Sequence, residues 1–304
     1  QLTTQVNEIQ AQSMNGNVDI TEVDGIDNAN ITALTGDVSL QSFSGDLGID
    51  AINAQNVNLT AQTGSIINAQ NNAQAVNVNA QSVVLDADKG IGAANNLFGL
   101  NVTNLSAQSN SGGIYVQQQS NNPLNLVAGD NEQAVSVKQG IIQINTQGDL
   151  NVNNDVINFA GSDINLNANG NIAQNADIMT LGKGNITVES ANNINMQSDA
   201  TLNNGVKTQT EGGIIQYNAA QDLELTSLVS NGFGGFININ ANNIVDGLNG
   251  DNLSATILNV QSPSLTDRAL ADLVGDRITE SALLRLNYRV IGGSLANSRK
   301  LMHE

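Results

Sequence analysis

A short phrase of alternating polar and apolar residues recurs at nearly regular intervals along the chain. It reads DVSLQS at residues 37–42, NVNLTA at residues 56–61 and DINLNA at residues 163–168. Alternation with a period of two is typical of a half-buried β-strand, and a strand nested in a longer fixed period indicates a repeat fold. Because each repeat in such a fold packs only against its neighbours, the array grows along one axis.

The apolar residues that open the phrases predict how the repeats stack. Valines open the early phrases at nearly equal intervals, and isoleucines open later phrases at slightly longer intervals. The valines are Val18, Val38, Val57 and Val76, and the isoleucines are Ile142, Ile164 and Ile186, followed by the pair Ile215 and Ile237. We expect the members of each series to lie above one another in successive coils.

Glycine and asparagine follow the phrases at the points where a coil must turn a corner, as Gly64 does after residues 56–61. Both residue types tolerate the positive φ that a sharp corner needs. Coils of about 20 residues are too short for repeats that contain helices. The sequence therefore predicts an all-β fold, a parallel β-helix (β-solenoid) with short coils of this length, which occupies residues 1–260.

Composition agrees with a narrow aliphatic core and an acidic surface. Aromatic residues make up 3% of the chain, and Trp and Cys are absent. The lack of Cys fits a reducing compartment and also fits an exported chain that crosses a pore unfolded. Residues 1–260 carry 23 acidic and 4 basic side chains, so we expect no nucleic-acid partner. No apolar run reaches the length of a membrane span, so we expect no membrane insertion.

The final segment, residues 261–304, departs from the repeat. It holds 6 basic and 5 acidic side chains, and Thr266 and Asp276 stand at possible N-caps of short helices. We expect a short non-repeat segment that is partly helical. One hypothesis is that its arginines dock on the acidic body of another copy and make a head-to-tail fibre; these are Arg268, Arg277, Arg285 and Arg289. The alternative is that the segment caps the last coil and blocks edge pairing.

Residues 65–116 carry the most characteristic succession of motifs: SIIN at 65–68, VNV at 76–78, KGIGAANN at 89–96, LSAQ at 105–108 and GGIYV at 112–116. A partial second copy reads NIVDG at 243–247 and DNLSA at 251–255. This succession resembles the repeat regions of filamentous-haemagglutinin-like adhesins, the exported partners of bacterial two-partner secretion. The family's secretion domain is not recognisable in this chain.

The resemblance implies a right-handed parallel β-helix at the outer cell surface or in the extracellular space. It further implies a role in adhesion, biofilm or matrix building. Surface glycans or receptors of host or neighbouring cells would then be partners, besides other copies of the chain.

Two residue types are candidates for chemistry. Asparagines at equivalent positions of stacked coils can form amide ladders, which either bind sugar hydroxyls or only support the fold; the candidates are Asn58, Asn77, Asn165 and Asn238. Asp86 and Asp88 share a strand face beside Lys89, so we consider loose Ca²⁺ binding there. The Gly-rich Asp repeats of calcium-binding β-helices are missing, and we expect no resident cofactor.

Three functions remain open at this stage. The first is a structural surface protein, a segment of an adhesin or matrix fibre that assembles head to tail and is not an enzyme. The second is a polysaccharide-binding module or lyase on a β-helix, against which stand the scarce aromatic and basic residues. The third is a passive stalk that only spaces a distant adhesive tip.

Overall fold

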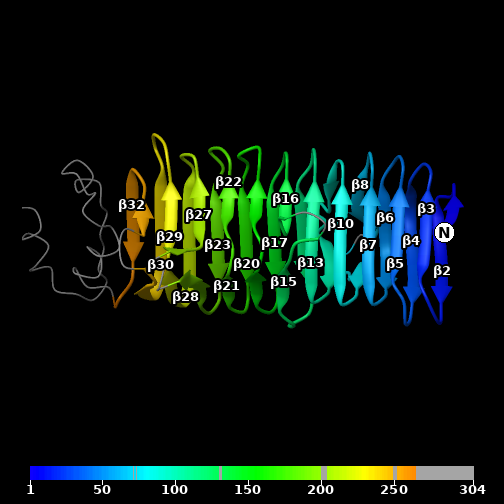
Figure 1. Cartoon of the computed structure of the whole chain (residues 1–304), viewed down its shortest axis with the longest axis horizontal. Helices are drawn as coiled ribbons and strands as arrows, with labels where there is room; N and C mark the ends of the chain where they lie inside the picture. The colour runs from blue at the N-terminus through cyan, green and yellow to red at the C-terminus, as the bar shows by residue number, and fades with distance from the viewer. Residues whose placement is uncertain (71, 73, 130–131, 200–203, 249–251, 265–304) are drawn as a thin grey trace, which may run out of the picture.

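The computed structural model describes residues 1–70, 72, 74–129, 132–199, 204–248 and 252–264. These residues form strands and no helix, and the strands stack in parallel into a β-solenoid of about 11 turns with roughly 22 residues per turn. Figure 1 shows the result as a rod whose strands run across its long axis. The predicted parallel β-helix is confirmed, and its coils are slightly longer than the sequence period indicates.

The strands line three sides of the rod, named here sides A, B and C. Side A consists of β1 (Leu2–Thr4), β3 (Val18–Glu22), β5 (Val38–Ser42), β7 (Asn56–Ala61), β10 (Ser82–Ala87), β13 (Asn104–Ser109), β16 (Val135–Val137), β19 (Val156–Asn158), β22 (Ile178–Thr180), β27 (Lys207–Thr210), β29 (Ser227–Ser230) and β31 (Leu253–Ser254).

Side B consists of β2 (Glu8–Ser13), β4 (Ile26–Ala33), β6 (Leu47–Asn53), β8 (Ser65–Asn68), β9 (Val78–Asn79), β11 (Gly90–Ile91), β12 (Phe98–Asn101), β14 (Ile114–Gln118), β17 (Ile142–Thr146), β20 (Ile164–Ala168), β23 (Ile186–Ser190), β28 (Ile214–Leu225), β30 (Phe236–Asp246) and β32 (Ile257–Gln261). Side C begins where β13 pairs with two strands at once. It consists of β15 (Leu124–Leu126), β18 (Leu150–Val152), β21 (Ile172–Gln174) and β24 (Ile194–Met196), continued by the second halves of β28 and β30.

One inward-facing column on side B runs from β4 to β32. Its members pair in register from coil to coil, and all are buried: Ile26, Leu47, Ile66, Ile91, Ile114, Ile142, Ile164, Ile186, Ile215, Ile237 and Leu258. Burying a side chain of this size stabilises the fold by about 1.5–3 kcal/mol. The stacking predicted for the isoleucine series is confirmed.

The valine series is confirmed only as far as Val57. The next partner of Val57 is Val83, and Val76 lies outside the strands. The reason is an insertion of residues 69–77 between β8 and β9, which lengthens the coil so that Ile66 pairs with Ile91. A fixed interval counted onward from Val57 therefore points to the wrong valine.

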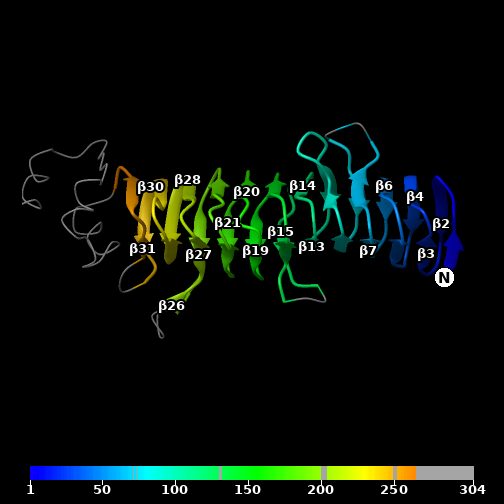
Figure 2. The ribbon, with the colours of Figure 1, turned by 90° about the horizontal axis from the view of Figure 1, so that it is seen from above.

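Inserted segments project from the rod on opposite sides (Figure 2). The segments around β8–β9 and β11–β12 stand on one side. The segment between β15 and β16 and the antiparallel hairpin of β25 (Ser198–Asp199) and β26 (Asn204–Gly205) stand on the other. The first two interrupt side B and the other two lie between sides C and A, and the stacked ladder continues past each insertion.

The last described strand is β32, and description ends at residue 264. The predicted helices of segment 261–304 lie outside the described residues, as do the four arginines of the assembly hypothesis: Arg268, Arg277, Arg285 and Arg289. None of the described residues belongs to a helix that is long and apolar enough to cross a membrane.

Candidate binding groove on the amide-covered side

The outward residues of side B form two parallel columns of polar side chains, because every second residue of a strand points away from the core. The first column consists of Asn145, Asn167, Glu189, Asn218, Asn240 and Gln261. The second consists of Gln143, Asn165, Thr187, Gln216, Asn238 and Asn259. Glu189 is the one charged member of these two columns.

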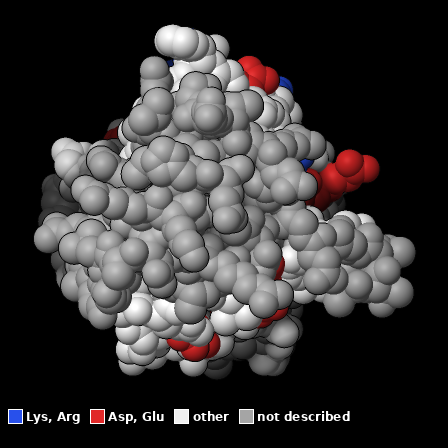
Figure 3. All heavy atoms as spheres, turned by 90° about the vertical axis from the view of Figure 1, so that its left-hand side faces the viewer, with Lys and Arg blue, Asp and Glu red and all other residues white. Residues whose placement is uncertain are grey.

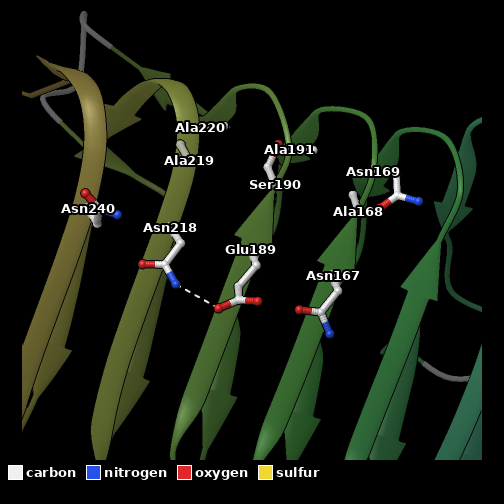
Figure 4. Close-up of a pocket in the computed structure, with 10 residues that line it drawn as sticks. All are labelled: Asn167, Ala168, Asn169, Glu189, Ser190, Ala191, Asn218, Ala219, Ala220 and Asn240. Carbon is white, nitrogen blue, oxygen red and sulfur yellow. Dashed lines mark hydrogen bonds between the residues drawn. The ribbon is translucent and has the colours of Figure 1, made fainter.

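A groove of about 470 Å³ opens where the first column meets the corner of the rod. Figure 4 shows Asn167, Glu189 and Asn218 side by side on β20, β23 and β28, with Asn240 on the next strand. Ala191 and Ala220 lie at the corner, and their small side chains leave the space above the strands open. The groove is therefore polar along its strand side, and its corner side combines alanines with Asn169.

Hydrogen bonds along the first column all point toward the N-terminal coils. Asn167 Nδ2 donates to Asn145 Oδ1 at 3.0 Å, and Asn218 Nδ2 donates to Glu189 Oε1 at 2.7 Å. Gln216 Nε2 also donates to Glu189 Oε1, at 3.3 Å. In this direction Asn167 Oδ1 should accept from the next coil, but the residue there is Glu189, whose carboxylate group has no amide donor.

The ladder is thus interrupted between Asn167 and Glu189. Both side chains present acceptor oxygens on adjacent strands, and such strands lie about 4.8 Å apart. No hydrogen bond joins these two side chains among the described contacts. An amide oxygen beside a carboxylate attracts a hydroxyl or ammonium donor. The groove can therefore hold a hydroxylated ligand, such as a sugar, at this break.

Asp86 and Asp88, the predicted cation ligands, lie on side A and at its corner, far from this groove in the register. Asp86 points outward from β10; loss of hydration raises the pKa of its carboxyl group, and the charge of Lys138 opposes this effect. Asp88 Oδ1 accepts from Asn110 Nδ2 at 3.3 Å. The described residues contain no group of three or more His, Cys, Asp or Glu placed to hold a metal ion. Loose Ca²⁺ binding at the two aspartates stays a prediction.

The predicted amide ladders exist, though not at every predicted position. Asn259 Nδ2 donates to Asn238 Oδ1 at 2.7 Å, which confirms one of them. Another ladder joins Asn104, Asn125 and Asn151. The prediction of a surface ladder is wrong for Asn77, because this residue is fully buried in the inserted coil. Asn58 and Asn165 face outward in strands but donate no amide-ladder bond among the described residues.

No family model, curated protein or solved structure matches the chain. The resemblance to adhesin repeats therefore stays a prediction. In the end-on view of Figure 3, acidic atoms appear at several places on the visible described surface and basic atoms at few. This agrees with the net charge of −18.

Sequence reasoning does not single out Glu189. The signal is nevertheless present, because Asn145, Asn167 and Glu189 follow one another at equal intervals along the chain. A carboxylate that replaces an amide in such a series marks a break in the ladder. This break can be located only when the register of the coils is known. The register cannot be counted from the sequence, because the insertions differ in length.

Proposed function

We propose that the protein is a stiff structural rod, a segment of an exported adhesin or matrix fibre, which joins end to end with further copies and is not an enzyme. Location outside the cell is part of this proposal. The stacked coils supply length and stiffness. The observation that supports assembly is the in-register parallel stacking of the described coils, because any further parallel coil can continue the same ladder.

The backbone edge of the first coil is unpaired in the described chain. Strand β1 pairs with β3 and strand β2 with β4, and both have their other edge free. Asn7 O and Ser13 O accept from Asp27 N and Leu34 N, at 2.8 and 3.0 Å. Because backbone groups alternate along a strand, Gln10 and Gln12 direct their N–H and C=O groups to the free edge.

Apolar side chains are also open at this end. Ile9 and Ala11 point inward from β2 but are only partly buried, whereas their register partners Ala29 and Ile31 are 0% exposed. A further parallel coil would cover both residues and complete the backbone ladder. The last coil of a second copy has the matching strand pattern, and contacts that repeat head to tail without closing produce filaments.

The test compares two double variants by electron microscopy and light scattering of the full chain. Gln10→Pro with Gln12→Pro removes two donors on the free edge and leaves the bonds to β4 in place. Gln10→Thr with Gln12→Thr changes the same side chains and keeps the donors. We expect the wild type and the threonine variant to form filaments and the proline variant to remain as single rods. Filaments of equal length in all three would overturn end-to-end assembly through this coil.

Deletion of residues 261–304 tests the arginine hypothesis separately. Loss of filaments in the deleted chain, with restoration when the wild-type segment is present, assigns the segment a linking role. Longer filaments after deletion assign it the role of a cap.

The groove at Glu189 favours a second candidate function, the binding of a glycan. At the break in the ladder, the acceptor oxygens of Asn167 and Glu189 would accept hydrogen bonds from sugar hydroxyl groups. An amino sugar would also place an ammonium group beside the carboxylate. The test is an array of neutral, acidic and amino-sugar oligosaccharides probed with the wild type and with Glu189→Gln. We expect binding to neutral or amino sugars that falls at least tenfold in the variant, since glutamine completes the amide ladder. An array without any hit, or hits that Glu189→Gln leaves unchanged, would leave the protein a passive rod.

A further inference from the structure

The edge between sides A and B, called here the A/B edge, consists of the residues that directly follow each side A strand. Phe43 N donates to Glu22 O at 2.9 Å, which places Phe43 one coil above Val23. Leu181 N donates to Asn158 O at 2.9 Å, which places Leu181 one coil above Phe159 in the same register. The edge is therefore a regular column with one outward residue per coil.

Large apolar residues on this edge occur as two stacked pairs. Val23, Phe43, Phe159 and Leu181 are 39%, 47%, 43% and 47% exposed. The chain has only five Phe, and two of them belong to these pairs. A single exposed apolar residue is ordinary on a protein surface, whereas repeated exposed pairs on one line indicate an interaction surface.

From Val23 to Leu181, the polar or apolar character of the edge residues follows the same order from either end. Four polar positions separate the two apolar pairs, so the eight coils read apolar, apolar, four polar, apolar, apolar; the polar residues are Gln62, Asp88, Asn110 and Lys138. A surface of this kind is self-complementary under a two-fold axis at its centre, where residue i of one copy meets residue j of the other and the reverse.

We infer that two copies of this chain associate side by side and antiparallel through the A/B edge. The two-fold axis makes each kind of contact occur twice. Each of the four contacts joins side chains of compatible chemistry. The contact between two phenylalanine rings also has a preferred geometry, which the contact between valine and leucine lacks. The contacts are Val23 with Leu181, Phe43 with Phe159, Gln62 with Lys138, and Asp88 with Asn110.

The charges in the corner turns favour the same register. Asp24 follows Val23, and Lys183 lies in the turn just after Leu181, so the pairing brings opposite charges to the same coil. A shift by one coil would instead place Val23 against Glu211 and Phe159 against Gln62. Both apolar residues would then lose their apolar partners.

Small residues allow the two edges to approach closely. Ala160 follows Phe159, and Gly182 follows Leu181, so no bulky side chain stands next to either member of the C-terminal apolar pair. The two apolar side chains can therefore reach the partner copy without steric hindrance from their chain neighbours on that side.

The contact is long and narrow. Eight coils at roughly 4.8 Å each span on the order of 35–40 Å. A strip one residue wide over this length buries less than the ~1,200 Å² of stable interfaces. We therefore expect a weak dimer that forms at high protein concentration. This inference does not depend on end-to-end assembly, which uses the ends of the rod.

Cysteine cross-linking tests the register directly, because the natural chain has no cysteine. The full chain is prepared as the single variants Phe43→Cys, Phe159→Cys and Leu34→Cys. Leu34 is 54% exposed and lies at a different corner of the rod, after β4, so it is the matched control. Pairs of variants are mixed and oxidised, and covalent dimers are counted by electrophoresis.

We expect the mixture of Phe43→Cys and Phe159→Cys to give at least fivefold more covalent dimer than either variant alone or either one mixed with Leu34→Cys. End-to-end stacking cannot produce this result, because Phe43 lies two coils and Phe159 four coils from the respective ends of the described rod. Equal yields in all mixtures would overturn the antiparallel register.

Sedimentation velocity adds a second readout. Phe43→Ser with Phe159→Ser should weaken the dimer at least tenfold, and Leu34→Ser should leave it unchanged. A wild type that stays monomeric at millimolar concentration would overturn the inference.

Discussion

Two coils of the rod differ in length: the coil from Ile142 to Ile164 is regular, and the coil from Ile66 to Ile91 contains an insertion. The first has the regular length, and its inward strand positions on side B are Ile142, Ile144 and, at the end of the strand, Thr146. The second is longer, because residues 69–77 are inserted between two side B strands. Buried amides occur in both coils, as Asn158 on side A of the regular coil shows, and the comparison teaches that the longer coil places two more of them, Asn68 and Asn77, on side B.

Asn77 shows how the compensation works. It is fully buried; its Nδ2 donates to Ile49 O at 2.7 Å, and its Oδ1 accepts from Gly99 N at 2.8 Å. Asn68 binds Asn77 through its Oδ1 and Leu97 O through its Nδ2. In a regular coil, these backbone N–H and C=O groups would bond to the backbone of the neighbouring coils. Here the amide side chains bond to them instead.

The largest expected effect breaks the regular coil. Leu166→Ala should lower the free energy of unfolding by about 3 kcal/mol, because Leu166 is 0% exposed between Ile144 and Val188 and its loss leaves a cavity. Denaturant unfolding measures the change. Leu166→Met is the volume-conserving control and should cost less than about 1.5 kcal/mol; equal losses for both would show that the coil is loosely packed.

A smaller effect is expected at the inserted coil. Asn77→Leu keeps the volume and leaves the Gly99 N–H buried without its acceptor, so the free energy of unfolding should fall by about 2 kcal/mol. Asn101→Leu, which removes a bond in an exposed ladder, should change it by less than ~0.5 kcal/mol. Amide hydrogen exchange at residue 99 should accelerate in the first variant. Unchanged exchange would contradict the role assigned to Asn77.

Tyr217 offers a third comparison, because it follows Leu166 and Val188 in the same column. Its hydroxyl group donates to Gln174 Oε1 at 2.6 Å and lies 2.7 Å from Thr208 Oγ1. Tyr217→Phe keeps the ring and should cost about 1 kcal/mol of stability. Adding Gln174→Met and Thr208→Val should recover part of this loss, as measured by denaturant unfolding of the single and the triple variant.

The smallest effect concerns Asp86. In the folded chain, loss of hydration raises the pKa of its carboxyl group above the ordinary value of 3.8. The charged form of Asp86 therefore opposes folding. This penalty is absent below the unfolded value of 3.8 and develops as the pH rises above it. Asp86→Asn should therefore raise Tm slightly at pH 7 and leave it unchanged at pH 3. A lower Tm at pH 7 would show that the contact with Lys138 dominates.

The sequence was sufficient to predict the parallel solenoid, since alternation and corner residues repeat in every coil. It could not predict which valine follows Val57, because the length of an insertion does not depend on the strands that it joins. The same uncertainty hid Glu189, whose importance depends on its being in register with Asn167. The self-complementary order of the A/B edge became visible only after every insertion had been assigned to its coil.

The direction of the ladder has a mechanical consequence. The strands lie across the rod, so the hydrogen bonds between coils run along its long axis. Tension applied to the two ends pulls these bonds apart one coil at a time instead of shearing many together. Each released coil of roughly 22 residues can extend to about 70 Å. Such a rod is stiff when pushed, and under strong pull it lengthens in steps and limits the force that it transmits.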